Sequence, residues 1–90
     1  MKKSIITVVG KDRVGIIADV CSLLAKNDIN ILDISQTITG GYFNMMMIVD
    51  TSASMKPYGV LADDIVLFGQ SIGMQIKIQR EDIFEEMHRI

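Results

Sequence analysis

Two adjacent glycines, Gly40 and Gly41, separate two long runs rich in β-branched and large apolar side chains, residues 30–39 and 42–50. A two-residue Gly-Gly loop favours a tight β-hairpin, because the turns that match the twist of paired strands need positive φ angles. Such a loop also sets the register of the two strands, with Thr39 opposite Tyr42. The expected core face of this hairpin comprises Leu32, Ile34, Gln36 and Ile38 opposite Val49, Met47, Met45 and Phe43.

The other face of the hairpin is mixed in character, neither a clean solvent face nor a clean core. In the expected register it comprises Ile31, Asp33, Ser35, Thr37 and Thr39 opposite Asp50, Ile48, Met46, Asn44 and Tyr42.

A strand and a helix are expected before the hairpin. Residues 4–9 are rich in β-branched side chains, which favours a strand ending at Gly10. Residues 14–26 carry apolar side chains at spacings of three and four, which predicts an amphipathic helix. Asp12 is expected to cap the first turn of this helix, because its carboxylate can accept from the free N–H groups there.

A second helix and two further elements are expected after the hairpin. Residues 58–72 again show helical spacing, with Pro57 suited to the first turn and Gly73 to the C-terminal cap. Residues 74–79 alternate between apolar and polar side chains, as a half-exposed strand does. Residues 81–90 predict a short terminal helix that must dock on something, because a helix of that length is marginal alone.

The resulting order is β-α-β-β-α-β, which is the ferredoxin-like plan of the α+β class: a four-stranded antiparallel sheet with two helices on one face. A chain of 90 residues allows one domain. We therefore assign residues 1–80 to this domain and residues 81–90 to a C-terminal helical extension of it.

Composition excludes several classes of function. The chain has one cysteine and one histidine, so neither an internal disulfide nor a Cys/His zinc set can form. A formal net charge of −2 argues against nucleic acid or an anionic membrane as partner. No run approaches the ~18 apolar residues of a membrane span, and no targeting segment stands out. We expect a cytoplasmic protein without a cofactor, a metal or catalytic residues.

The segment between the first strand and the first helix is the most informative one for function. Its sequence, Gly-Lys-Asp-Arg-Val-Gly-Ile, places two glycines and two basic residues at a helix N-terminus. Open N–H groups and the positive end of the helix dipole suit a carboxylate or a phosphate there. A tight turn with solvated charges explains the same spacing, and from spacing alone it is the better explanation. Asn30 is likewise explained as a turn residue.

The stretch from residue 8 to residue 50 resembles an ACT domain, the small-molecule regulatory module of amino-acid metabolism. The likeness is carried by the G-x-D-x-x-G-I loop of residues 10–16 and by the Asn30-Ile31 pair after the helix. It covers essentially the whole chain. It is strongest with the stand-alone ACT proteins of bacteria and archaea, and it extends to the ACT modules of formyltetrahydrofolate deformylase and of the glycine cleavage system transcriptional repressor.

This resemblance implies that a ligand, usually a free amino acid, binds at a dimer interface. By analogy the loop would supply Gly10, Asp12, Arg13, Gly15 and Ile16, and the neighbouring chain would supply Asn30 and Ile31. Many members of the family have proline where this chain has Val14, and valine can adopt the same helical angles, so the loop is expected to keep its shape.

Three functions compete for this fold. The first is a non-catalytic binding module that passes its ligand state to a regulated protein, which the sequence does not name. The second is a small hydrolase of the acylphosphatase type, with Arg13 as anion clamp and Asn44 orienting water, although the G-x-V-x-G-V-x-F-R loop of that family is missing. The third is an RNA-binding sheet, which needs stacking aromatics that residues 4–9 lack. The binding module ranks first.

Self-association is expected from the second strand, which lies at a sheet edge in this topology. Residues 31–39 form a long strand with no proline and only Asp33 charged, and such an edge needs covering or pairing. We expect a homodimer, with second strands side by side as the first choice and stacked sheets as the second.

Overall fold

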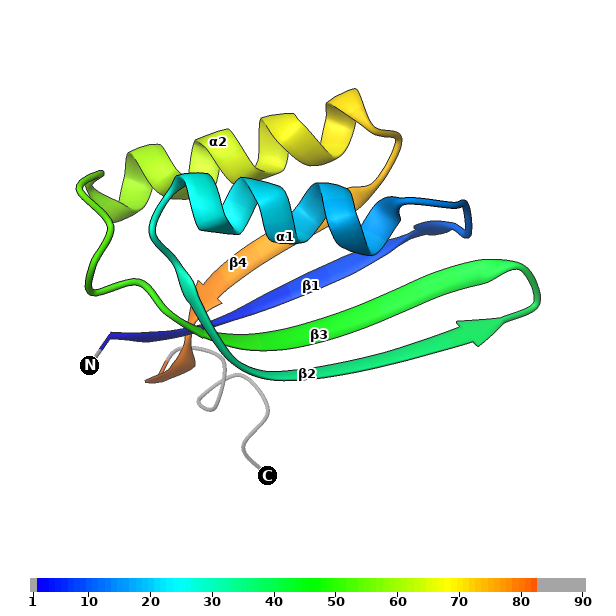
Figure 1. The fold of residues 1–90 in the computed structure, drawn as a ribbon, viewed down its shortest axis with the longest axis horizontal. Coiled ribbons are helices and arrows are strands. Elements are labelled where there is room, and N and C mark those ends of the chain that lie inside the picture. The colour runs from blue at the N-terminus through cyan, green and yellow to red at the C-terminus, as the bar shows by residue number, and fades with distance from the viewer. Residues whose placement is uncertain (1, 83–90) are drawn as a thin grey trace.

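The computed structural model describes residues 2–82. Its elements are β1 (Lys3–Lys11), α1 (Ile16–Lys26), β2 (Asn30–Thr39), β3 (Tyr42–Asp50), α2 (Tyr58–Ser71) and β4 (Gln75–Arg80). The strands form one antiparallel sheet in the order β2-β3-β1-β4, and both helices lie on the same face of it (Figure 1). The ferredoxin-like plan is thus confirmed. The terminal helix expected for residues 81–90 lies, from residue 83 on, outside the described residues.

The β2–β3 hairpin has the predicted turn. Gly40 and Gly41 have φ angles of 59° and 81°, and Thr39 pairs with Tyr42 as expected. The predicted register holds until Asp33, after which Leu32 is left unpaired in a bulge. Ile31 therefore lies opposite Val49 rather than Asp50, and it packs against the core instead of belonging to the mixed face.

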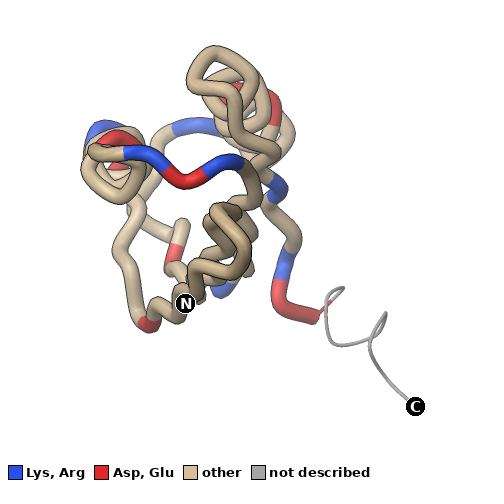
Figure 2. The backbone as a smooth tube through the Cα atoms, turned by 90° about the vertical axis from the view of Figure 1, so that its right-hand side faces the viewer, with Lys and Arg blue, Asp and Glu red and all other residues tan. Residues whose placement is uncertain are grey.

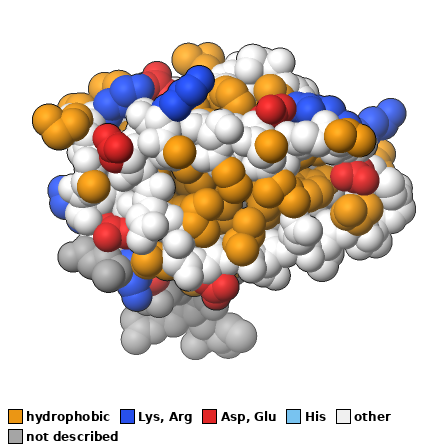
Figure 3. Space-filling model, in the orientation of Figure 1, with side chains coloured by type: hydrophobic (Ala, Val, Ile, Leu, Met, Phe, Trp, Pro, Cys, Tyr) orange, Lys and Arg blue, Asp and Glu red, His pale blue; other side chains and the backbone are white. Residues whose placement is uncertain are grey.

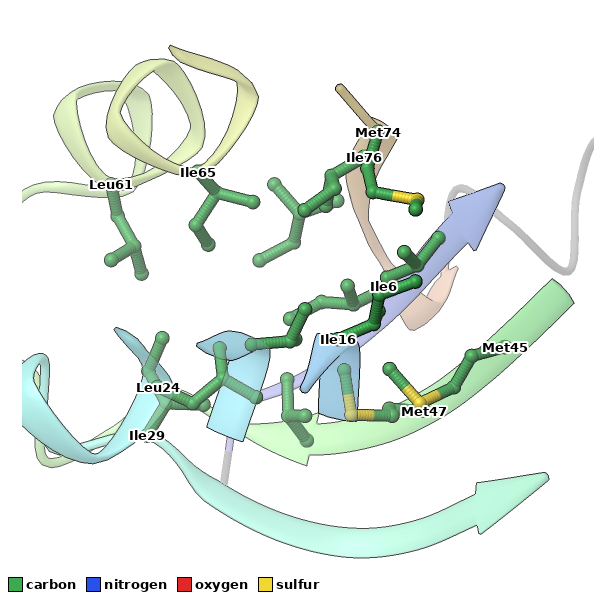
Figure 4. Packing of buried hydrophobic residues seen from close by; sticks show 14 of the residues in the cluster. Ile6, Ile16, Leu24, Ile29, Met45, Met47, Leu61, Ile65, Met74 and Ile76 are labelled. Atoms are coloured by element: carbon green, nitrogen blue, oxygen red, sulfur yellow. The ribbon is translucent and has the colours of Figure 1, made fainter. Parts of the chain in front are cut away.

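The core lies between the two helices and the strands β1, β3 and β4 (Figure 4). Helix α2 approaches β4 most closely at Gly69, where an added Cβ would lie 2.8 Å from Ile76 Cγ1 and 2.9 Å from the Met74 carbonyl oxygen. The helix ends before Gly73, whose φ angle of 73° confirms the predicted glycine cap. Within the part of the chain that the structure describes, no helix is long and apolar enough to cross a membrane.

The β2 half of the expected core face is not buried. Phe43, Met45, Met47 and Val49 of β3 are buried as predicted, but Leu32, Ile34, Gln36 and Ile38 of β2 are exposed. The prediction was wrong for β2 because the twist of the sheet turns this free edge away from the helices. Figure 3 shows the result as a band of hydrophobic side chains open to solvent between α1 and β2.

Candidate functional site

The loop between β1 and α1, with the last residues of β1 and the first residue of α1, carries five of the seven expected site residues. It lies at the same end of the molecule as the β2–β3 turn, and Figure 2 looks onto this end, where the charged residues of the loop follow one another along the chain. Helix α1 begins at Ile16 rather than at Val14, and Gly15 precedes it in the left-handed region, with φ 91°. Gly15 thus turns the chain into the helix.

Asp12 does not cap α1, contrary to expectation, because no side chain hydrogen-bonds the N–H groups at the start of this helix. Gly15 occupies the N-cap position. Asp12 lies three residues before it and is therefore too early in the chain to be the capping residue. Its backbone N–H instead donates to the carbonyl oxygen of Gly41, at 3.0 Å. This hydrogen bond joins the loop to the hairpin turn.

The guanidinium of Arg13 folds back onto α1. Its Nη2 lies 2.9 Å from Oδ2 of Asp19, and its Nη1 donates to the carbonyl oxygen of Val14 at 3.0 Å. Both side chains of the ion pair are about two-fifths exposed, and exposed pairs of this kind contribute only ~0–1 kcal/mol. The Arg13–Asp19 contact therefore contributes little to the stability of the fold.

Gly10 and Ile16 each have a structural role that explains the residue at that position. A Cβ at Gly10 would overlap Sδ of Met74 and lie 3.3 Å from the carbonyl oxygen of Gly73, so this glycine permits the close approach of β1 to the start of β4. The side chain of Ile16 is 2% exposed and belongs to the core. The side chain of Ile16 is therefore not available to a ligand.

Asn30 and Ile31 lie at the opposite end of the sheet from this loop. Asn30 pairs with Asp50, which pairs with Lys3, whereas Thr39 pairs with Tyr42, which pairs with Lys11. Nine residues of strand separate the two ends, or ~30 Å. Asn30 is exposed and Ile31 is half-buried. One chain therefore does not bring the seven residues together.

The pair expected for a hydrolase does not converge. Asn44 alternates with the buried Phe43 and Met45, so it lies on the sheet face away from the helices, where it lines a shallow depression of about 270 Å³. Arg13 is engaged on the helix side, by Asp19. Among residues 2–82, no three His, Cys, Asp or Glu side chains are placed to hold a metal ion.

A larger cleft of about 470 Å³, for which the sequence gives no signal, lies at the end of the sheet away from the loop. Its lining comes from four separate segments, which no local pattern in the sequence could have joined. The lining residues are Lys2, Lys3, Ser4, Thr51, Tyr58, Arg80, Glu81 and Asp82.

Comparison with known proteins supports the resemblance noted from the sequence. The ACT domain family model matches residues 3–79. A UPF0237 protein of Bifidobacterium longum is 56% identical over 90 residues, with 100% of both chains covered. The structure of an ACT domain protein from Streptococcus pneumoniae has a TM-score of 0.82 and 44% identity, covering 93% of this chain and 94% of that one. The structure of a putative glycine cleavage system transcriptional repressor has a TM-score of 0.72 and 27% identity, covering 88% of this chain and 45% of that one.

Proposed function

The chain belongs to the ACT domain family of regulatory small-molecule-binding modules, and on this premise we propose that it is a non-catalytic cytoplasmic homodimer that binds a free amino acid between its two copies. The observation that carries the proposal is the position of the expected site residues, which lie at opposite ends of one chain. A second copy is needed to complete the site.

The exposed edge of β2 supports the dimer. Ile34 and Ile38 are 43% and 57% exposed. Among residues 2–82, no strand pairs with the outer edge of β2, where the N–H of Ile34 donates to the carboxylate of Asp33 at 2.8 Å. Pairing two copies of β2 would provide hydrogen-bond partners along this edge and cover the apolar side chains on both copies at once.

An antiparallel pairing of the two β2 strands also accounts for the site. Full overlap of residues 30–39 with their counterparts places the partner's Asn30 beside Thr39 of the first chain. Thr39 adjoins the hairpin turn, to which the hydrogen bond from Asp12 to Gly41 ties the glycine loop. Each dimer would thus hold two equivalent sites, each built from one chain's loop and the other chain's Asn30.

The groups gathered at such a site suit an α-amino acid. The N–H groups at the start of α1, which have no side-chain cap, and the guanidinium of Arg13 would bind the carboxylate. The amide oxygen of Asn30 can accept from the ammonium group. The structural relative described as a glycine cleavage system repressor points to the same class of metabolite.

A thermal-shift screen against the common amino acids tests ligand binding. An amino acid at 100 times its dissociation constant should stabilise the protein by ~2.7 kcal/mol. Gly15→Ala and Asn30→Ala should each lose this response. If no amino acid raises the melting temperature of the wild-type protein, the proposed ligand class is wrong.

Mixing the two inactive variants tests whether the site is shared. In hybrid dimers one of the two sites combines an intact loop with an intact Asn30, so random exchange should restore about a quarter of all sites. Calorimetric titration of the mixture measures this fraction. A mixture as inactive as its components would show that loop and Asn30 do not act across the interface.

A further inference from the structure

The cleft at the other end of the sheet lies where three elements meet. The start of β1, the end of β4 and the first turn of α2 lie together at the left of Figure 1, far from the glycine loop. Ser4 and Gly10 lie near the two ends of β1, six residues or ~20 Å apart. The volume of about 470 Å³ is within the range of small-molecule sites.

Hydroxyl groups form the inner wall of this cleft. Ser4 and Thr51 are 1% and 8% exposed, so they are polar side chains held inside the fold at its edge. Burial raises the pKa of Tyr58 above 10.0. Ser4 and Arg80 act on Tyr58 by lowering the pKa of its phenol, and burial outweighs this effect. The phenol therefore stays protonated at neutral pH and can donate a hydrogen bond.

The start of α2 adds a positive end to the same cleft. This helix has Pro57 at its cap position, no side-chain cap and no acidic residue in its first turn, whereas α1 has Asp19 in its first turn. Tyr58, its first residue, lines the cleft. The dipole of α2 is thus left uncompensated at this point by residues of its own first turn.

The charged residues of the lining are arranged around one ion pair. Among the described residues of the lining, Lys2, Lys3 and Arg80 supply three positive charges and Glu81 and Asp82 supply two negative ones. Nε of Arg80 lies 3.5 Å from Oδ1 of Asp82. The side chains of Arg80 and Asp82 are 56% and 74% exposed, so the guanidinium is accessible to a ligand at the mouth of the cleft.

We propose that this cleft binds a phosphate monoester of a small hydroxylated metabolite. The hydroxyl of Tyr58, the ammonium groups of Lys2 and Lys3 and the guanidinium of Arg80 line it, which are more donors than the two oxygens of a carboxylate can use and which suit the three terminal oxygens of a phosphate. The hydroxyl of Thr51 is not among these donors, because it donates to the carbonyl oxygen of Lys2 at 3.4 Å. The carboxylate of Glu81 is an acceptor for a hydroxyl of the same ligand. The site is separate from the glycine loop and does not depend on the dimer.

The test uses amide NMR spectra of the full chain at constant ionic strength, with inorganic phosphate, ribose 5-phosphate and acetate as probes. Both phosphate probes should shift the amides of Ser4, Thr51 and Tyr58 with saturation, and acetate should bind at least tenfold more weakly. Ribose 5-phosphate binding more tightly than phosphate identifies the ester as the ligand, and equal binding would overturn the role given to Glu81.

Variants distinguish specific recognition of phosphate from a general attraction of anions to the positive charges of the cleft. Tyr58→Phe should weaken phosphate binding about fivefold, and Arg80→Gln by tenfold or more, since the latter removes a charged donor. Tyr42→Phe, at an exposed tyrosine in the far hairpin, is the matched control and should bind like wild type. Unchanged affinity in both cleft variants, or shifts confined to the glycine loop, would overturn the proposal.

Discussion

Strands β2 and β4 are the two edges of one sheet, and both direct alternate apolar side chains towards the helices. In β4 and the residue before it, Met74, Ile76 and Ile78 are all buried, because α2 lies against them. In β2, Ile34 and Ile38 are exposed, because the sheet twists that edge away from α1. The same alternating pattern is thus buried in β4 and exposed in β2, because a helix covers β4 and does not cover β2.

The difference explains what each edge can do. The apolar side chains of the β4 edge are buried in the core, and a polar cleft lies at the end of this strand. The apolar side chains of the β2 edge stay exposed, and pairing with a second copy of the same strand would cover them on both copies at once. The fold needs β4, and the proposed site needs β2.

Truncating one isoleucine in each strand gives the largest expected contrast. Ile76→Ala should lower the free energy of unfolding by about 3 kcal/mol at any protein concentration, because it leaves a cavity under α2. Ile34→Ala should cost the isolated chain less than about 1 kcal/mol, but should weaken the dimer about tenfold. Urea unfolding followed by circular dichroism at two protein concentrations separates the two effects. Equal, concentration-independent losses would remove the distinction between the edges.

Two glycines of α2 test how closely this helix packs on the β4 edge. Gly69→Ala should destabilise the fold by about 1–3 kcal/mol, because the added Cβ would press on Ile76 and on the carbonyl of Met74. Gly59→Ala in the same helix meets nothing within 4 Å and should be neutral or stabilise by up to about 1 kcal/mol. Thermal and urea unfolding of both variants measure the difference. A Gly69→Ala protein as stable as Gly59→Ala would show that α2 does not lie so close to β4.

A third glycine variant probes the loop that the open edge is proposed to complete. Gly15 has a φ angle of 91°, so Gly15→Ala should cost about 1–2 kcal/mol of stability while the chain still folds and self-associates. Sedimentation and urea unfolding check both expectations. Loss of the dimer in this variant would place the loop, rather than β2, at the main contact between copies.

The smallest effect concerns Asp50, which faces the start of β2 across the hairpin. Hydrogen bonds from the Ser52 hydroxyl and the Ser52 N–H lower the pKa of Asp50 below 3.8, with a further contribution from the Lys2 N–H. Since the folded pKa is the lower one, the stabilisation is present above pH 3.8 and is lost as the pH falls through the folded pKa. Ser52→Ala should raise the Asp50 pKa in a carboxyl NMR titration, and Ser54→Ala should not. An unchanged Asp50 titration in Ser52→Ala would contradict this assignment.

Local signals in the sequence predicted every element that the structure describes. The Gly40–Gly41 turn, Pro57 before α2 and Gly73 after it each act within a few residues, so they can be interpreted without knowing the fold. The bulge at Leu32 could not be predicted, because it depends on how β2 bends as the sheet twists. The exposure of β2 follows from the same twist.

The candidate site was predictable only in part. The glycine loop stands out because its residues are consecutive, yet the left-handed Gly15 and the contact of Asp12 with Gly41 depend on the hairpin packing beside it. The polar cleft gave no signal, since Ser4 and Tyr58 are ordinary residues of a strand and a helix until the fold brings them together.

The most direct test of the central claim is sedimentation equilibrium of the wild-type chain beside Ile34→Lys at micromolar concentration. The chain mass is 10.0 kDa. Pairing through β2 predicts a wild-type species of about 20 kDa, twice the chain mass, and a folded variant that sediments as a single chain, because each copy would have to bury a lysine where the pairing covers an apolar side chain. A wild-type protein that sediments as one chain, or a variant that stays at twice the chain mass, would contradict the account.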